Sequence, residues 1–166
     1  VSGNNLFVGT EGEGVFLSTN NGCSWSEINN GITNKMIFSL AVSGNSIFAG
    51  AGANIFLSNN NGTTWTEVNN TVPAVNVMMV SGTNIFAGTS GGGIYLSNDN
   101  GTTWVEKNNG LTNKQVYTLN INGNSIFAGT SDDFGEGYIY QSTDNGNNWV
   151  QVSNGFSIKR VLSLVS

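Results

Sequence analysis

An eight-residue pattern occurs four times in this 166-residue chain, and it constrains the fold more than any other feature. The copies read STNNGCSW, SNNNGTTW, SNDNGTTW and STDNGNNW, and their tryptophans stand at positions 25, 65, 104 and 149. Two further segments recur in step with these octets. One reads NNLFVG, NSIFAG, TNIFAG and NSIFAG, and the other reads VFLS, IFLS, IYLS and IYQS. Tryptophan spacings of 40, 39 and 45 residues indicate a fold built from structural repeats.

Each repeat contains four short segments typical of β-strands, separated by turns rich in Gly, Asn and Ser. Strands such as IFSLAV at 37–42 place apolar residues on both faces, so they must be covered from both sides. A period of about 40 residues, four strands per repeat and two buried faces predict a β-propeller blade. We therefore expect an all-β propeller of four-stranded antiparallel blades. It forms one domain over residues 1–166, with repeats at about 1–41, 42–79, 80–120 and 121–166.

The two ends of the chain resemble complementary parts of one blade. The segment VLSLV at 161–165 aligns with IFSLA at 37–41, whereas Val1 aligns with Val42. We expect the C-terminal strand to close the N-terminal blade, which would remove exposed sheet edges. Because four blades is the small end of the propeller range, two alternatives stand beside this one. A second copy of the chain completes a larger ring as a homodimer, or the chain is a slice of a longer array.

Composition excludes several classes of partner. Only 9% of residues are charged, the net charge is −5, and there are five Lys and Arg residues, so the clustered cations that bind nucleic acid are missing. No apolar run approaches the roughly 20 residues that span a bilayer, so we expect no membrane insertion. The bias toward Asn, Ser, Thr and Gly favours a secreted or cell-surface protein of bacterial type. The single Cys23 stands where the other octets have Thr or Asn, which indicates a small turn residue.

The octet resembles the Asp box of bacterial neuraminidase repeats, SxDxGxxW, found in sialidases, sortilin-type receptor domains and photosystem II assembly-factor-like propellers. Its Asp or Asn can accept backbone hydrogen bonds, its Gly permits a left-handed backbone, and its Trp fills the gap between sheets. Two copies carry Asn in place of Asp, which a turn tolerates but a catalytic carboxylate does not. The resemblance implies scaffold residues at the blade periphery: Ser18, Asn20, Gly22, Trp25, Ser58, Asn60, Gly62, Trp65, Ser97, Asp99, Gly101, Trp104, Ser142, Asp144, Gly146 and Trp149.

A binding site is expected at the other end of the strands, where the loops differ between repeats. The candidate residues are Glu11, Glu13, Asp132, Asp133, Phe134, Glu136, Lys159 and Arg160, with Lys35 and Lys114 nearby. The acidic loop 132–136 either binds a hard cation or is simply solvated, and it lacks an EF-hand spacing, so we assign no metal and no cofactor. Phe134 either stacks on a sugar or peptide or folds back onto its own loop.

The resemblance to sialidases suggests an enzyme, but the residues oppose it. Sialidase chemistry implies three arginines around the substrate, whereas this chain has only Arg160, and it has no His for a catalytic triad. We expect a non-enzymatic binding or scaffold module that recognises protein or glycan through the variable loops. The alternative is a fragment of a carbohydrate-active enzyme, either with catalytic residues elsewhere or with a carboxylate pair from Glu11 or Glu13 and Asp132 or Asp133.

Overall fold

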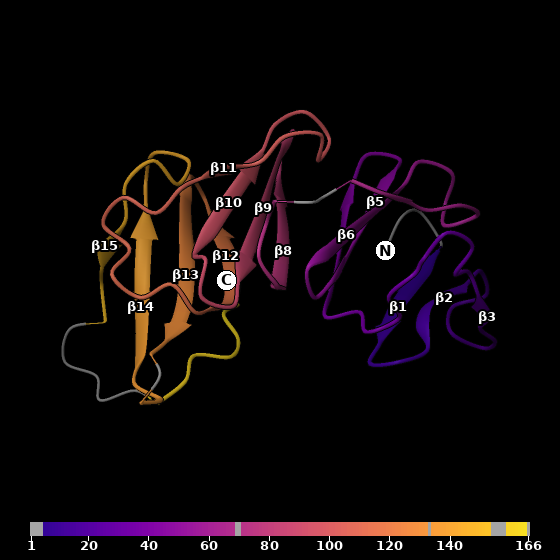
Figure 1. The fold of residues 1–166 in the computed structure, drawn as a ribbon, viewed down its shortest axis with the longest axis horizontal. Coiled ribbons are helices and arrows are strands. Elements are labelled where there is room, and N and C mark those ends of the chain that lie inside the picture. The colour runs from indigo at the N-terminus through magenta and orange to yellow at the C-terminus, as the bar shows by residue number, and fades with distance from the viewer. Residues whose placement is uncertain (1–4, 69–70, 133, 154–158, 166) are drawn as a thin grey trace.

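The computed structural model describes residues 5–68, 71–132, 134–153 and 159–165, and all regular elements in these ranges are β-strands (Figure 1). No helix that is long and apolar enough to cross a membrane occurs there. The strands are β1 (Leu6–Thr10), β2 (Gly14–Ser18), β3 (Ser26–Glu27), β4 (Ser39–Ser43), β5 (Ser46–Ala51), β6 (Asn54–Ser58), β7 (Thr66–Glu67), β8 (Val75–Ser81), β9 (Asn84–Thr89), β10 (Ile94–Ser97), β11 (Val105–Glu106), β12 (Val116–Asn122), β13 (Ser125–Ser131), β14 (Gly137–Ser142) and β15 (Val150–Gln151).

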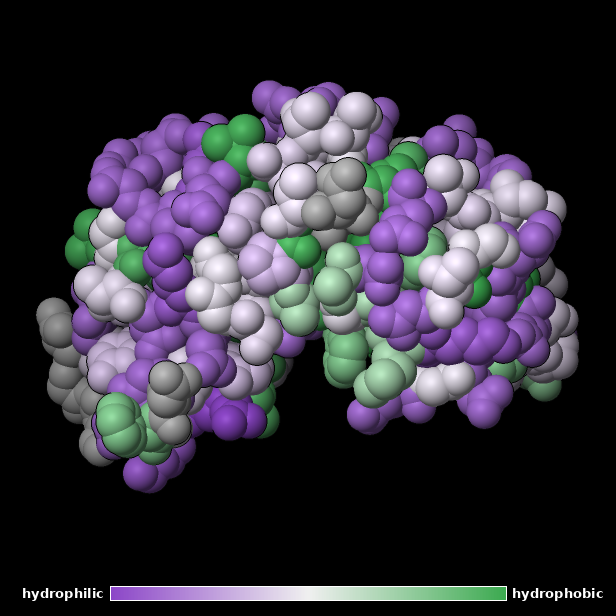
Figure 2. Space-filling view, in the orientation of Figure 1, coloured by the Kyte–Doolittle hydropathy of each residue, from purple (hydrophilic) through white to green (hydrophobic). Residues whose placement is uncertain are grey.

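These strands form four antiparallel sheets, each a simple meander. The first blade is the three-stranded sheet β1-β2-β3, and the second, third and fourth blades are the four-stranded sheets β4 to β7, β8 to β11 and β12 to β15. Figure 1 shows the blades side by side along an arc, with the first and fourth at its two ends. In the space-filling view a notch separates the half with the first two blades from the other half (Figure 2). The predicted all-β propeller architecture is confirmed.

A separate apolar core lies between each pair of neighbouring blades. The first core contains Val15 and Phe56, the second contains Phe48 and Val75, and the third contains Trp149 among others. The second strand of each four-stranded blade is the most buried. Blades on both sides cover β5 and β9, whereas β13 is covered by the third blade on one face and by residues 161–165 on the other. Every blade is therefore stabilised by its neighbours rather than by a core of its own.

The glycine that ends each recurring FVG or FAG segment allows this close packing. A Cβ added to Gly50 would lie 2.9 Å from Cγ1 of Val75, and one added to Gly88 would lie 2.6 Å from Cγ1 of Val116. Val75 and Val116 open the first strands of the next blades. Only glycine leaves room for the inner strand of one blade to rest on the sheet before it.

The C-terminal residues continue this pattern instead of closing the ring. A Cβ added to Gly129 would lie 2.5 Å from Cγ1 of Val161, so Val161 packs on Gly129 as Val116 packs on Gly88. The Asn120 side-chain amide also donates a hydrogen bond to the Leu164 carbonyl at 3.2 Å. Residues 161–165 thus lie where a fifth blade would begin. Within the described ranges β1 pairs only with β2, and the first blade lies at the far end of the arc (Figure 1). The expected closure of the N-terminal blade within one chain is therefore wrong.

Two of the four octet tryptophans lock neighbouring blades together as predicted. Trp65 and Trp149 are only 4% and 3% exposed, and their indole N–H groups donate to the carbonyls of Ile28 and Lys107 in the preceding blade, at 2.7 and 2.8 Å. The Trp104 indole is half-buried and donates to the carbonyl of Gly101 in its own turn at 3.0 Å. Trp25 is 42% exposed, because no described blade precedes the first one.

We expect Trp149→Ala to lower the free energy of unfolding by about 3–5 kcal/mol, the usual cost of truncating a buried tryptophan. The adjacent Val150 is 66% exposed, so Val150→Ala should change stability by no more than about 0.5 kcal/mol. Urea unfolding followed by far-UV circular dichroism measures both. Equal losses for the two variants would contradict the role of Trp149 as an anchor between blades.

Candidate functional site

The octets form nearly identical turns held by side-chain hydrogen bonds. In the third octet the Ser97 hydroxyl donates to Oδ1 of Asp99 at 2.8 Å and accepts from the Gly101 amide at 2.8 Å. The Thr103 amide donates to the same Asp99 oxygen at 2.9 Å. The other three octets repeat these bonds within 0.1 Å. The predicted hydrogen bonds from backbone amides to the Asp or Asn side chain are confirmed. The donor amide belongs to the residue four positions further along the chain.

The two central residues of each turn have left-handed backbone. The Asn at the fourth octet position has φ of 55–57° in every copy, and the following Gly has φ of 79–85°. Asn and Gly adopt this region at the lowest cost, which explains why the pair Asn-Gly recurs without exception. The Ser and the Asp or Asn side chains that build the octet make their hydrogen bonds within their own turn, as expected of scaffold.

Asp and Asn are interchangeable in the octet because the residue at the seventh position donates a hydrogen bond to Asp but accepts one from Asn. The Thr103 hydroxyl donates to Oδ2 of Asp99 at 2.6 Å, whereas Nδ2 of Asn60 donates to the Thr64 hydroxyl at 2.8 Å. A hydroxyl can do either. The side-chain bond from Thr103, followed by the backbone bond from the same residue, lowers the pKa of Asp99. The Asn148 side chain lowers the pKa of Asp144 in the same way.

Charged residues lie at the end of the third and fourth blades that is opposite to the octet turns. Three of the five Lys and Arg residues of the chain, Lys114, Lys159 and Arg160, belong to the segments at this end, together with Asp132 and Glu136. The predicted site residue Asp133 lies outside the described residues. This surface therefore combines both signs of charge.

The loop after β13 is ordered by the side chain of Asp132. Its Oδ1 accepts the backbone amides of Phe134 at 3.0 Å and Glu136 at 2.8 Å, and the Asp132 amide donates to the Glu136 carbonyl at 2.8 Å. Phe134 is 91% exposed, so it does not fold back onto its loop. Among the described residues no group of three or more His, Cys, Asp or Glu is placed to hold a metal ion. The loop instead presents an aromatic ring to solvent.

A cavity of about 280 Å³ adjoins this loop. It is lined by Gly91, Thr112, Asn113, Lys114, Gln115 and Asp132. The loop after the second strand and the link before the first strand therefore meet at one end, as predicted. Sequence reasoning did not single out Thr112, Asn113 and Gln115, because they belong to a link that looks like ordinary turn sequence.

Tyr117 connects the basic C-terminal residue Arg160 to this cavity. The Arg160 guanidinium lies 4.8 Å from the centre of the Tyr117 ring, a cation–π contact, and the Tyr117 hydroxyl donates to Oε1 of Gln115 at 3.0 Å. Lys159 lies 3.9 Å from the Glu136 carboxylate, and such an exposed pair contributes little stability. Lys159 therefore meets the acidic loop, whereas Arg160 stacks on a tyrosine.

Tyr138 marks the side of the loop that faces the sheet. Partial desolvation, followed by the negative charges of Asp132 and Glu136, raises the pKa of its hydroxyl. The hydroxyl lies 3.4 Å from Oδ2 of Asp132 as a hydrogen-bond donor. The acidic loop thus has a polar inner side against β14 and an apolar outer side at Phe134.

The remaining predicted residues lie at the other end of the arc. Glu11 forms an isolated bridge with Met36, and the Glu13 amide donates to the Thr10 hydroxyl at 3.1 Å, both in the first blade. Lys35 binds Glu27 at 2.8 Å, and this hydrogen bond raises the pKa of Lys35. The structure therefore divides the candidate residues between the first and fourth blades instead of uniting them in one site.

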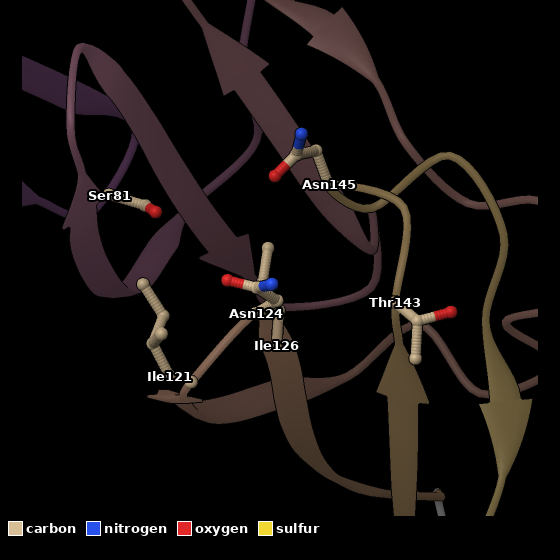
Figure 3. Close-up of a pocket in the computed structure, with 7 residues that line it drawn as sticks. Ser81, Ile121, Asn124, Ile126, Thr143 and Asn145 are labelled. Carbon is tan, nitrogen blue, oxygen red and sulfur yellow. The ribbon is translucent and has the colours of Figure 1, made fainter.

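A second cavity, of about 310 Å³, lies at the octet end between the third and fourth blades. Figure 3 shows Asn124 and Asn145 extending their amides toward the space beside Ser81. Its lining is neutral and consists of Ser81, Ile121, Gly123, Asn124, Ile126, Thr143 and Asn145. The sequence identified these residues only as turn and scaffold. Nothing in the repeated segments distinguishes the turns that line this cavity from the equivalent turns of the other blades.

Residues 1–117 match the DUF6242 beta propeller domain, and the chain belongs to this family. No curated protein matches the chain. Among solved structures, an ancestral GH74 enzyme is 22% identical with a TM-score of 0.73, over 96% of this chain and 25% of that one. YCF48 bound to D1 peptide is 14% identical with a TM-score of 0.69, over 87% of this chain and 50% of that one.

The computationally designed protein Ika8 is similar to the same degree. It is 14% identical with a TM-score of 0.68, over 94% of this chain and 48% of that chain. The chain thus spans between a quarter and a half of the length of these three proteins. At such identities the likeness establishes the β-propeller fold.

The lowered pKa of Asp99 predicts a pH effect that the Asn-containing octets lack. Because this carboxyl is more acidic in the folded chain than in the unfolded chain, its contribution is complete well above pH 3.8 and is lost as the pH falls through the folded-state pKa. Asp99→Asn should therefore reduce the loss of stability on acidification, and the reciprocal Asn60→Asp should increase it. Unfolding midpoints of the three proteins measured from neutral to acidic pH give the test, and parallel curves would contradict it.

Proposed function

We propose that the chain is an Asp-box propeller of the bacterial neuraminidase repeat type and serves as a non-enzymatic, protein-binding module. The loop end of the third and fourth blades is its recognition surface. The four superimposable octet turns support the family assignment. The bias toward neutral polar residues supports a secreted or cell-surface location in a bacterium.

The observation that carries this proposal is the exposure of Phe134. A ring that is 91% exposed costs free energy in water, yet the backbone amides of Phe134 and Glu136 both donate to the Asp132 carboxylate. Aromatic residues and Arg are enriched where proteins bind one another, and Arg160 lies on the same end of the fourth blade. These hydrogen bonds restrict the backbone of Phe134 and Glu136, so less conformational entropy is lost when a partner binds the ring.

A peptide segment is the ligand that fits this surface best. One apolar side chain packs on Phe134, and a neighbouring polar side chain or backbone amide enters the cavity between Lys114 and Asp132. A cavity of about 280 Å³ with one cation and one carboxylate offers both a donor and an acceptor. YCF48, a structural neighbour, is itself bound to a peptide. A second copy of the chain is a separate partner that meets the ends of the arc rather than this surface.

The alternative, a fragment of a carbohydrate-active enzyme, is supported by the similarity to the GH74 enzyme. A two-carboxylate glycosidase needs its carboxyl groups within about 10 Å of each other. Glu11 and Glu13 belong to the first blade and Asp132 to the fourth, with two blades between them. This arrangement favours the binding module, with glycan as the second class of ligand that the test includes.

A screen of a random peptide library against the immobilised chain tests the proposal, with a glycan array run in parallel. We expect peptides whose affinity falls at least tenfold, about 1.4 kcal/mol, for Phe134→Ala and for Lys114→Ala. Val105 is 58% exposed on β11, so Val105→Ala is the matched control and should leave affinity unchanged.

Two outcomes would overturn the proposal. Selected peptides could bind Phe134→Ala as tightly as the parent chain, which would place their site elsewhere. The array could instead return glycans while the library returns no peptide, which would make the ligand a carbohydrate. Circular dichroism of each variant establishes that the fold is retained before binding is compared.

A further inference from the structure

The pair Asn-Gly occurs eight times in this sequence, and each copy brings two groups together that can react with each other. The side-chain amide of Asn stands next to the backbone nitrogen of the following residue, and glycine has no Cβ to hinder the attack of that nitrogen on Cγ. Asn is accordingly among the thermolabile residues. Seven of the eight pairs lie within the described residues, and the pair at 154–155 lies outside them.

Four of the pairs are the central residues of the octet turns, where the glycine amide is already engaged. The Gly101 amide donates to the hydroxyl of Ser97, a residue that is only 1% exposed, at 2.8 Å. The glycines of the other three octets bond to their serines at 2.8–2.9 Å. A Cβ added to Gly101 would lie 3.2 Å from Phe48 and from Val68 of the preceding blade. The nitrogen can therefore turn toward Cγ of Asn100 only if this hydrogen bond breaks and the packed turn moves.

Two further pairs lie in the links between blades, where the next blade holds their peptide group. The carbonyl of Asn109, which belongs to the peptide bond with Gly110, accepts the backbone amide of Trp149 at 2.9 Å. A Cβ added to Gly110 would clash with the Trp149 carbonyl, so the two backbones are in close contact. The pair at 30–31 makes the same contacts with Trp65. Rotation of either peptide group would disturb the contact between two blades.

The seventh described pair, Asn122 and Gly123, lacks such contacts. It opens the turn between β12 and β13, where Gly123 has φ of 58° and an added Cβ would meet no atom within 4 Å. Within the described ranges neither the Asn122 side chain nor the Gly123 amide forms a hydrogen bond. The equivalent Gly82 of the third blade is equally open although the whole fourth blade follows it. The openness of this turn is therefore a property of the hairpin.

We propose that Asn122 is the residue at which the folded chain modifies itself, by cyclisation with the nitrogen of Gly123. The other six described pairs are held unreactive by their own turns and by neighbouring blades. Reaction at Asn122 requires that its backbone pair with Ser125 opens, and this pair is the last of its ladder. The end of a ladder beside an exposed turn opens at a low cost in free energy.

The reaction needs only water and hydroxide. Hydroxide removes the proton from the Gly123 nitrogen, which then forms a bond to Cγ of Asn122. The bond between Cγ and Nδ2 breaks, and the side-chain nitrogen takes a proton from water and leaves as ammonia. Water then opens the resulting succinimide ring. Opening at Cγ gives Asp, whereas opening at the backbone carbonyl gives isoaspartate, in which the main chain continues through Cγ.

Either product changes the octet end of the fourth blade. A carboxylate replaces a neutral amide next to Gly123 and Asn124, which line the cavity of about 310 Å³. Isoaspartate also lengthens the main chain in a two-residue turn, and the register of β12 with β13 depends on that turn. The modification therefore acts at the opposite end of the strands from Phe134 and is independent of the recognition surface there.

Ageing of the folded chain in mildly alkaline buffer, followed by peptide mapping with fragmentation in a mass spectrometer, tests the proposal. The rate of each residue in urea is its reference, and these rates should be similar because Gly follows every one of the seven residues. Relative to this reference, we expect Asn122 in the folded chain to react at least tenfold faster than the other six, about 1.4 kcal/mol in the free energy of local opening. A smaller difference would overturn the proposal.

Asn122→Ser is the matched variant, because Ser43 and Ser81 hold the same position in the equivalent hairpins. It should keep the circular dichroism spectrum of the parent chain. Ageing should lower the urea midpoint of the parent chain as isoaspartate accumulates at position 122, and it should leave the midpoint of Asn122→Ser unchanged. Equal losses in the two proteins would overturn the assignment of the modification to this turn.

Ser97→Ala tests how an octet pair is protected. The variant removes the acceptor of the Gly101 amide, so the reaction at Asn100 should become faster by about tenfold or more, the effect of losing one buried hydrogen bond. Asn61 and Asn145 of the same protein keep their serines and should keep their rates. An unchanged rate at Asn100, or a parallel increase at all three residues, would overturn the protection by the hydroxyl.

Discussion

Packing between neighbouring sheets is the constraint on which the rest of this structure depends. No blade has an interior of its own, since the apolar side chains of each sheet are buried only where the next sheet covers them. In the second and fourth blades the octet makes that cover specific, because its turn sets the position of a tryptophan whose indole donates to a carbonyl of the blade before it. Stability therefore increases with every added neighbour, as in other repeat proteins.

The regular part of the structure could be predicted from the sequence because it is repeated. Four in-phase copies of the octet and of the FAG segment identify strands, turns and blade length independently of one another. The hydrogen bonds of Asp99 followed from the residue types alone. The glycine of the FAG segment was a visible signal, and its reason, the valine of the next blade against Gly50, required coordinates.

Features that occur once were harder to predict. Charge and insertion length indicated the loop around Asp132, but the side chains that complete its cavity, such as Gln115 and Tyr117, lie in unremarkable sequence. The expectation that Glu11 and Asp132 share one site was not met. A residue's place within its repeat determines at which end of the strands it lies, whereas its distance from a residue of another repeat depends on how many blades lie between them. The curvature per blade, which decides closure, has no signature in the sequence.

The reversible hydrogen bond at the seventh octet position has a further consequence. Because Thr64 can accept where Thr103 donates, each octet carries either a neutral or an anionic side chain on the same backbone. The periphery of the propeller can thus vary in electrostatic potential, one elementary charge per blade, while its geometry remains constant. Surface properties and architecture are in this way independently adjustable within a single repeat.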